Sequence, residues 1–224
     1  MRRPRALALP LALALPLLGA TPALAVVTVP EDCAVPPFID LSQYNLIIGT
    51  DGRDHLTGTE GADFICGLLG DDVIRGGGGD DLILGDTTTF FGNVGAVGGD
   101  DLIDGGAGDD EILSGPGDDH VAGGTGDDFL LQTGTVDGND SPATTGAVLY
   151  VDAGAGYDNV VLAGDVRGRS TQFARVYLGA DDDALDVTGV TFSAGPNGAI
   201  PVANRLTNGG AGTDTLSDAD AVGT

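Results

Sequence analysis

The sequence predicts an all-β repeat protein, and three observations lead to this fold class. Nine-residue units follow one another in phase, each unit is glycine-rich in its first four places, and a large aliphatic residue recurs at the eighth place. The clearest run covers residues 105–131, which read GGAGDDEIL, SGPGDDHVA and GGTGDDFLL. Glycines allow tight turns and positive φ angles, and the last three residues of a unit alternate outward, inward and outward as a short strand. We therefore expect short strands joined by glycine-rich turns.

Residues 1–25 have the composition of a secretory signal peptide. Arginines near the start precede an apolar run over residues 6–20, and the triplet Ala23-Leu24-Ala25 is typical of a signal peptidase site. A transmembrane anchor is the alternative, but two prolines within the run and its short length argue against it. We expect a secreted, extracellular protein that starts at Val26 and does not insert into the membrane after cleavage.

The mature chain is strongly acidic. It has six of the nine arginines, no lysine and all 34 acidic residues, which gives a net charge of −28. Such a surface repels nucleic acid and anionic lipid, and it attracts cations. An acidic, glycine-rich composition is also compatible with disorder. Because the aliphatic residues recur at fixed phase, we expect a chain that folds once its charge is neutralised.

Residues 26–48 carry three prolines and no repeat phase, and they are expected to form an N-terminal cap over the open end of the array. Cys33 lies in this stretch, whereas Cys66 occupies the ninth place of a repeat. Two cysteines in an exported protein favour a disulfide, with two free thiols as the alternative. A bridge would hold the cap over the first coils.

Complete units fill residues 49–131 in two blocks, separated by a spacer at 85–95. Every unit has aspartate at its sixth place and an aliphatic residue at its eighth. The sixth-place aspartates are Asp54, Asp63, Asp72, Asp81, Asp101, Asp110, Asp119 and Asp128. The eighth-place aliphatic residues are Leu56, Ile65, Ile74, Ile83, Ile103, Ile112, Val121 and Leu130.

The spacer leaves two arrangements open. If it replaces one repeat turn, Asp81 faces Asp101 across a lengthened coil. If it loops out entirely, Asp72 pairs with Asp101 and Asp81 pairs with Asp110. The sequence does not choose between them.

Residues 132–224 form a degenerate region. Residues 132–147 are turn-rich and are expected to loop out. Three echoes of the motif follow at spacings of 25 and 31 residues, and each has an aliphatic residue two places after the aspartate. We expect wider, irregular coils that continue the same stack. The pairs are Asp158 with Val160, Asp183 with Leu185, and Asp214 with Leu216.

The units over residues 49–131 resemble the RTX or haemolysin-type calcium-binding family, and residues 153–217 resemble it faintly. The resemblance implies a parallel β-roll, a solenoid in which successive repeats turn on alternate sides and two repeats make one coil. It also implies a Ca²⁺ ion between stacked turns, held by the sixth-place aspartates and by backbone carbonyls of the glycine-rich part. Ca²⁺ prefers such hard oxygen ligands.

Carried over to this sequence, the resemblance assigns side-chain ligands to the eight sixth-place aspartates. The stacked pairs are Asp54–Asp72, Asp63–Asp81, Asp101–Asp119 and Asp110–Asp128. Carbonyl ligands fall on Gly49, Gly58, Gly67, Gly76, Gly105 and Gly123, and Asp158, Asp183 and Asp214 are weaker candidates. Carboxylates stacked about 4.8 Å apart repel each other by about 3–4 kcal/mol at an effective dielectric near 20. We therefore expect Ca²⁺ binding and folding to be one event.

The remaining polar residues have simpler interpretations. The fifth-place aspartates are expected to face solvent, and His55 and His120, at the seventh place, are expected to be surface residues rather than zinc ligands. The fifth-place aspartates are Asp71, Asp80, Asp100, Asp109, Asp118 and Asp127.

Catalytic motifs are missing from the sequence. It contains neither H-E-x-x-H nor G-x-S-x-G, and a carboxylate at every ninth residue predicts a structural ladder rather than a glycosidase pair. We expect a non-catalytic, calcium-binding structural or surface module. The alternative is an adhesion or interaction module that binds a polysaccharide or protein through one face of the roll. Ice binding would require a Thr/Asn ladder, which the third and fifth places lack.

Overall fold

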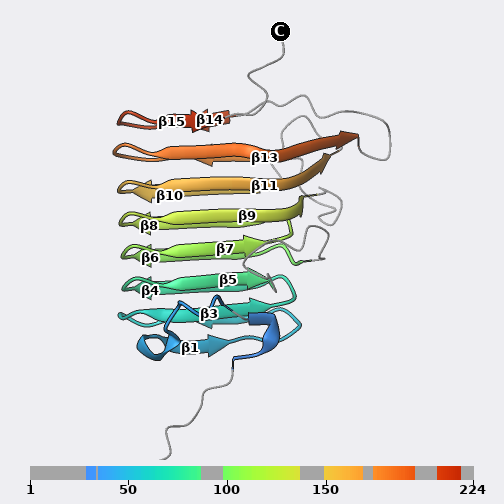
Figure 1. Cartoon of the computed structure of the whole chain (residues 1–224), viewed down its shortest axis with the longest axis vertical. Helices are drawn as coiled ribbons and strands as arrows, with labels where there is room; N and C mark the ends of the chain where they lie inside the picture. Colours follow the sequence, from blue (N-terminus) through green and yellow to red (C-terminus); the bar gives the residue numbers. More distant parts are fainter. Residues whose placement is uncertain are drawn as a thin grey trace, which may run out of the picture.

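The computed structural model describes residues 29–33, 35–86, 98–136, 149–168, 174–194 and 206–217. Within these residues, two parallel sheets of stacked strands face each other, and Figure 1 shows the coils lying one upon another. The chain moves to the opposite sheet after each strand, so that odd-numbered strands form one sheet and even-numbered strands the other. The predicted parallel β-roll is confirmed. The expected signal peptide lies outside the described residues.

Each sheet has its strands in chain order. Sheet A contains β1 (Asn45–Ile48), β3 (Asp63–Leu68), β5 (Leu82–Asp86), β7 (Glu111–Gly115), β9 (Phe129–Val136), β11 (Asn159–Gly168), β13 (Ala184–Ala194) and β15 (Thr215–Ser217). Sheet B contains β2 (His55–Thr57), β4 (Val73–Gly78), β6 (Leu102–Ala107), β8 (His120–Thr125), β10 (Leu149–Ala155), β12 (Ala174–Tyr177) and β14 (Leu206–Asn208).

The eighth-place aliphatic residues form the core between the two sheets. They stack in register, as Ile65 on Ile83 and Ile74 on Ile103 show. All of those predicted are buried except Leu56, which is half-buried at the N-terminal end. This placement follows from the out-in-out alternation of a strand, in which only the middle residue of the triplet points between the sheets.

The degenerate region continues the stack, as the echoes predicted. Strand β11 pairs with β9 and β13, and β10 pairs with β8 and β12. Val160 and Leu185 are buried in the same core, whereas Leu216 is 54% exposed at the C-terminal end. The eighth-place position therefore keeps its structural role although the coils are wider.

The strand pairing decides between the two arrangements that the sequence left open. Strand β4 pairs with β6 and β5 pairs with β7, so Asp72 stacks with Asp101 and Asp81 with Asp110. Asp86 still lies opposite Leu68 in the sheet register. The interruption therefore falls inside one turn, after Asp86, and not before Gly85 as the sequence pattern placed it. The pattern missed this because the interrupted unit is split between both sides of the insertion.

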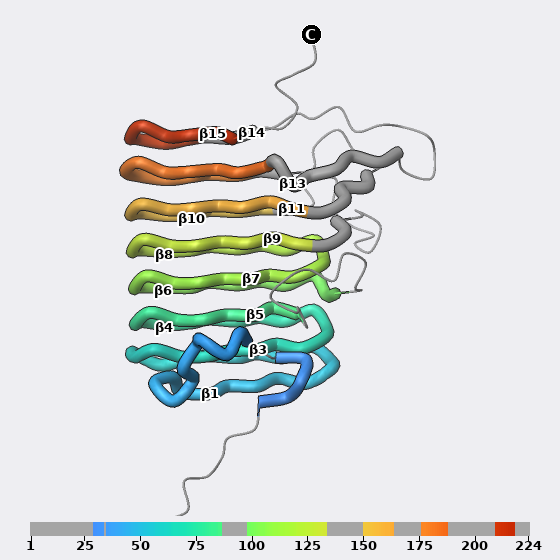
Figure 2. Tube along the Cα trace, viewed as in Figure 1, coloured from blue at the N-terminus to red at the C-terminus, as the bar shows by residue number. Residues whose placement is uncertain are grey.

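The N-terminal cap packs on the outer face of sheet A and not over the open end of the array, where the sequence placed it. It contains two short 3₁₀ helices, η1 (Glu31–Cys33) and η2 (Leu41–Gln43), and Figure 2 shows its blue trace against the first coils. Cys33 and Cys66 form a disulfide with a Cα–Cα distance of 6.1 Å. The cap covers an apolar outer cluster, and β1 adds the first strand to the sheet. The buried members of this cluster are Cys33, Phe64, Cys66, Leu82, Leu84 and Leu113.

Candidate metal centre

The glycine-rich turns line the two edges of the roll, and the two edges differ. The turns from sheet B to sheet A have one length throughout, and we call this side the regular edge. Its sixth-place aspartates are Asp63, Asp81, Asp110, Asp128, Asp158, Asp183 and Asp214. The opposite side, the interrupted edge, carries Asp54, Asp72, Asp101 and Asp119. The row of aspartates on this edge ends at Asp119, because the strand register places Leu149 at the equivalent position of the next coil.

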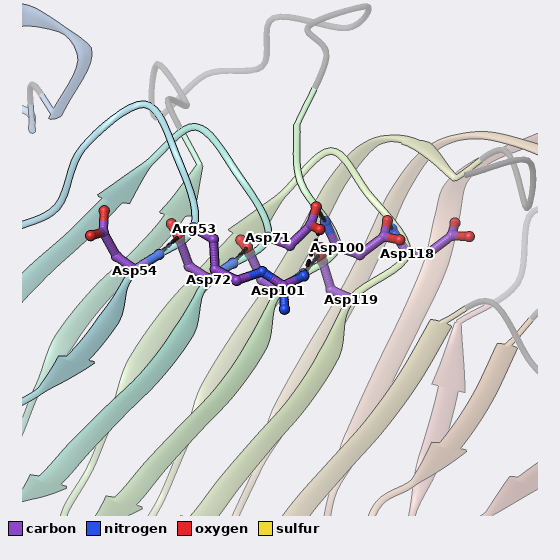
Figure 3. A network of polar contacts seen from close by, with 8 residues as sticks. All are labelled: Arg53, Asp54, Asp71, Asp72, Asp100, Asp101, Asp118 and Asp119. Carbon is purple, nitrogen blue, oxygen red and sulfur yellow. Dashed lines mark hydrogen bonds and ion pairs between the residues drawn. The ribbon is translucent and has the colours of Figure 1, made fainter. Parts of the chain in front are cut away.

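Beyond the first turn of each edge, a sixth-place carboxylate connects two coils. Its Oδ1 accepts a hydrogen bond from the backbone N–H of the sixth-place aspartate in the preceding coil, as when Asp81 N donates to Asp110 Oδ1 at 2.9 Å. Figure 3 shows this arrangement on the interrupted edge, where Asp101 N donates to Asp119 Oδ1 at 3.0 Å. Every predicted pair of aspartates is adjacent in this way. The turns are therefore held in register by the same side chains that bring negative charge to the edges.

The second carboxylate oxygen is buried without a hydrogen-bond partner in most of these aspartates. Within the described residues, this holds for Oδ2 of Asp72, Asp81, Asp101, Asp110, Asp119, Asp128, Asp158 and Asp183. A buried polar atom without a partner costs about 1–3 kcal/mol, and more when it is charged. Such a row of oxygens fits a set of cations that would supply the missing interaction.

Backbone carbonyls border the same spaces. A β-carbon at Gly76 would overlap both Asp81 Oδ2 and the Gly105 carbonyl oxygen, and one at Gly105 would overlap Asp110 Oδ2 and the Gly123 carbonyl oxygen. The first-place glycine therefore keeps open a space that a carboxylate oxygen and a carbonyl oxygen of the next coil share. The carbonyls placed in this way belong to Gly67, Gly76, Gly85, Gly105, Ser114, Gly123 and Ala153.

This set overlaps the predicted carbonyls only in part. Gly49 and Gly58 belong to the first glycine-rich turns of their edges, and their carbonyls do not take this position. Sequence reasoning missed Ser114 and Ala153 because it searched for glycines, whereas a carbonyl oxygen is present in any residue.

In the first turn of each edge, a threonine donates hydrogen bonds to the sixth-place aspartate. Asp54 Oδ2 accepts hydrogen bonds from Thr50 N at 2.6 Å and Thr50 Oγ1 at 2.8 Å. Asp63 Oδ2 accepts them from Thr59 N at 2.5 Å and Thr59 Oγ1 at 3.0 Å, and Asn45 Nδ2 donates to Asp63 Oδ1 at 2.7 Å. These residues were missed, although threonine at the second place of only the first two units was a usable signal.

The interrupted edge is closed by two side chains at its other end. Ser114 Oγ donates to Gln132 Oε1, and Gln132 Nε2 donates to the Gly115 carbonyl at 2.7 Å. Both residues take the first place of a turn, where earlier coils have glycine. These side chains lie at the turn of Asp119, where the row of aspartates ends.

The buried, stacked carboxylates repel one another along both edges. Burial is the largest cause that raises the pKa of these aspartates, and neighbouring carboxylates add to it, while the backbone hydrogen bonds act in the opposite direction. The pKa rises to about 6 for Asp72, Asp81 and Asp158, to about 7 for Asp110, Asp119 and Asp128, to about 8 for Asp101 and to about 9 for Asp86.

The fifth-place aspartates form a second, outer row. Asp118 N donates to Asp100 Oδ1 at 3.0 Å, and Asp100 N donates to Asp71 Oδ1 at 3.3 Å (Figure 3). Arg53 forms an ion pair with Asp71 at 2.7 Å, which lowers the pKa of that carboxyl. Asp71 is exposed, as expected, but Asp100 and Asp118 are half-buried. These side chains therefore also connect the coils.

The donor set is made of oxygen atoms. Among the described residues, no group of three or more His, Cys, Asp or Glu side chains could hold a metal by itself. Any ion at an edge would depend on carboxylates combined with backbone carbonyls, a hard set that suits Ca²⁺ better than Zn²⁺ or Cu²⁺. His55 and His120 are both exposed, on the outer face of sheet B.

Fold and edges together define a parallel β-roll with acidic, oxygen-lined turns. The model of the RTX calcium-binding nonapeptide repeat matches in four copies, over residues 45–74, 67–87 and 96–130. These residues are therefore similar to calcium-binding repeats of the RTX type. The comparisons with curated proteins and with solved structures found no match. No helix in the described part of the chain is long and apolar enough to cross a membrane.

The first-place glycines give a steric prediction. Gly105→Ala should lower the free energy of unfolding in Ca²⁺ by about 1–3 kcal/mol, because its β-carbon overlaps Asp110 Oδ2 and the Gly123 carbonyl. Gly52→Ala is the matched control, since a β-carbon there meets nothing within 4 Å. Thermal denaturation of both variants measures the difference. Equal melting temperatures would contradict the assignment of the shared space.

The raised pKa values predict how acid affects the metal-free chain. Free aspartates titrate near pH 4, whereas the buried ones titrate at about 6 to 9. The folded state therefore binds more protons than the unfolded state between these values, and its stability falls as pH rises. In EDTA, we expect more β signal in circular dichroism and a higher melting temperature at pH 5.5 than at pH 8. An unchanged or rising stability over this range would contradict the prediction.

Proposed function

We propose that this protein is a secreted, non-catalytic calcium-binding module whose roll folds when Ca²⁺ binds between stacked turns. The observation that carries the proposal is the row of buried, partnerless Oδ2 atoms, each beside a carbonyl oxygen of the next coil in the central turns. The match to calcium-binding repeats supports the identity of the ion.

The ligands follow from the stacking of the turns. Oδ2 of a sixth-place aspartate and the carbonyl of the first-place residue in the next coil face one ion. The side-chain ligands are Asp72, Asp81, Asp101, Asp110, Asp119 and Asp128, together with Asp54 and Asp63, whose Oδ2 atoms also accept hydrogen bonds from Thr50 and Thr59. Asp158 and Asp183 are weaker candidates, because Ala153 and Leu178 replace the first-place glycine and are buried in the apolar core. Asp214 keeps a first-place glycine, Gly209, but it is a weaker candidate because its turn leads into β15, the last strand of the sheet.

The chemistry favours Ca²⁺ over Mg²⁺. Carbonyl and carboxylate oxygens from two coils form an irregular shell, which Ca²⁺ accepts with six to eight ligands, whereas Mg²⁺ requires near-octahedral geometry at shorter distances. The disulfide between Cys33 and Cys66 supports export to an oxidising compartment. The signal-peptide pattern in residues 1–25 supports the same conclusion.

Circular dichroism of the mature chain, residues 26–224, tests the proposal. At pH 7.5, we expect a coil spectrum in EDTA and a β spectrum after addition of Ca²⁺, with a much weaker response to Mg²⁺. Asp110→Asn should move the Ca²⁺ midpoint several-fold higher, because it keeps Oδ1 and removes the charge and Oδ2. Asp109→Asn, at an exposed fifth place, is the control. A chain that is equally compact in EDTA would overturn the proposal.

One observation favours the alternative of an interaction module. On the outer face of sheet B, His120 stacks on Tyr150 with ring centroids 5.3 Å apart, and Tyr150 lies 5.6 Å from Tyr177. The sequence pattern missed this aromatic column because Tyr150 and Tyr177 belong to the wider coils. Binding of the Ca²⁺-loaded chain to a glycan array, lost in Tyr150→Ala, would support it. Equal glycan-array signals for the wild-type chain and the Tyr150→Ala variant would exclude this column as the binding surface.

A further inference from the structure

Asp86 lies outside the sixth-place pattern, yet it is buried within the interrupted edge. It ends β5 and is 1% exposed. Its place is the second in the turn, where the preceding turn of this edge has Leu68 and the following one has Gly115. A β-carbon at Gly115 would come within 2.7 Å of Asp86 Cβ. The glycine in the next coil therefore makes room for this carboxylate.

The two oxygens of Asp86 have different surroundings. Oδ1 accepts the backbone N–H of Gly99 at 3.1 Å, which joins the two sides of the insertion. Oδ2 is buried and has no hydrogen-bond partner among the described residues. A β-carbon at Gly98 would overlap both Asp86 Oδ2 and the Pro116 carbonyl oxygen. A glycine thus again leaves a space between a carboxylate oxygen and a carbonyl oxygen of the next coil.

A second carboxylate enters the same turn. Asp101, its sixth-place residue, also has a buried and partnerless Oδ2, which borders the Ser114 carbonyl oxygen at Gly85. Burial is the largest cause that raises the pKa of Asp86, and the charge of Asp101 is the second largest. The interrupted turn therefore has two partnerless carboxylate oxygens, with the carbonyls of Ser114 and Pro116 beside them.

We propose that Asp86 is an additional calcium ligand, so that the interrupted turn binds its ion with two carboxylates from one turn. The inference rests on the proposed function and extends it to a residue outside the nonapeptide motif. The ion would hold Asp86 on one side of the insertion and Asp101 on the other. It would thereby join the two halves of a turn that the inserted residues separate in sequence.

The arrangement has two consequences for the protein. More negative charge in the ligand shell raises affinity for Ca²⁺, so this site should fill before the other sites of the interrupted edge. Closing an inserted loop costs conformational entropy, and an ion bound to both of its ends offsets that cost. The first repeat block and the second would then fold as one stack.

Calcium titration of the mature chain tests the role of Asp86. In isothermal titration calorimetry at pH 7.5, with bound ions counted by native mass spectrometry, we expect Asp86→Asn to lose one ion or to weaken one tight site at least tenfold. Asp104→Asn is the control, because Asp104 is exposed at the ninth place of the same unit. Identical isotherms and ion counts for the two variants would overturn the inference.

Asp86→Leu separates ligation from folding, because Leu68 already occupies the equivalent place one coil earlier. If Asp86 is a ligand, this variant also loses the ion while keeping its β spectrum in saturating Ca²⁺. If Asp86 is only a buried charge, Asp86→Leu melts at a higher temperature and binds as many ions as the wild-type chain, which refutes the inference. A wild-type chain that binds no Ca²⁺ would instead refute the proposed function.

Discussion

Repulsion between carboxylates stacked along two edges is the constraint on which the rest of the structure depends. Neighbouring coils lie about 4.8 Å apart, and two charges at that distance repel by about 3–4 kcal/mol at an effective dielectric near 20. The backbone hydrogen bonds to Oδ1 align the side chains without removing the charge. A domain has only about 5–15 kcal/mol of net stability. Several uncompensated contacts of this kind would be comparable with that stability.

Within each turn, the aspartate contributes charge and the glycines determine the backbone geometry. The sixth-place aspartate supplies one oxygen to the backbone of the neighbouring coil and directs the other into the space between turns. The first-place glycine keeps that space open, because a β-carbon at Gly76 or Gly105 would occupy it. Glycines at the second and fourth places, such as Gly106 and Gly108 with φ of 113° and 130°, allow the sharp turn. The eighth-place residue then fixes the strand against the core.

The sequence was sufficient to predict whatever repeats with a fixed period. The core positions, the stacked aspartate pairs and the continuation of the stack to Asp214 all follow from one motif. The sequence was insufficient where the role of a residue depends on residues that are close in space but distant in the chain. The places of Asp86 and Gly85 depend on a turn that is split by an insertion, and the roles of Thr50 and Gln132 depend on the ends of a row of aspartates. The outward Phe64 and Leu82 were not recognised as the surface that the cap covers.

The two edges explain where the chain tolerates extra residues. On the regular edge, each carboxylate after Asp63 meets the backbone of the preceding coil, and the turn length stays constant throughout. The extra residues of the longer coils all come between a strand of sheet A and the following strand of sheet B, after β5, β9, β11 and β13. Three of these connections follow Asp119, where Ser114 and Gln132 have already closed the row. Only the first lies within the row of aspartates, and there a second carboxylate, Asp86, enters the turn.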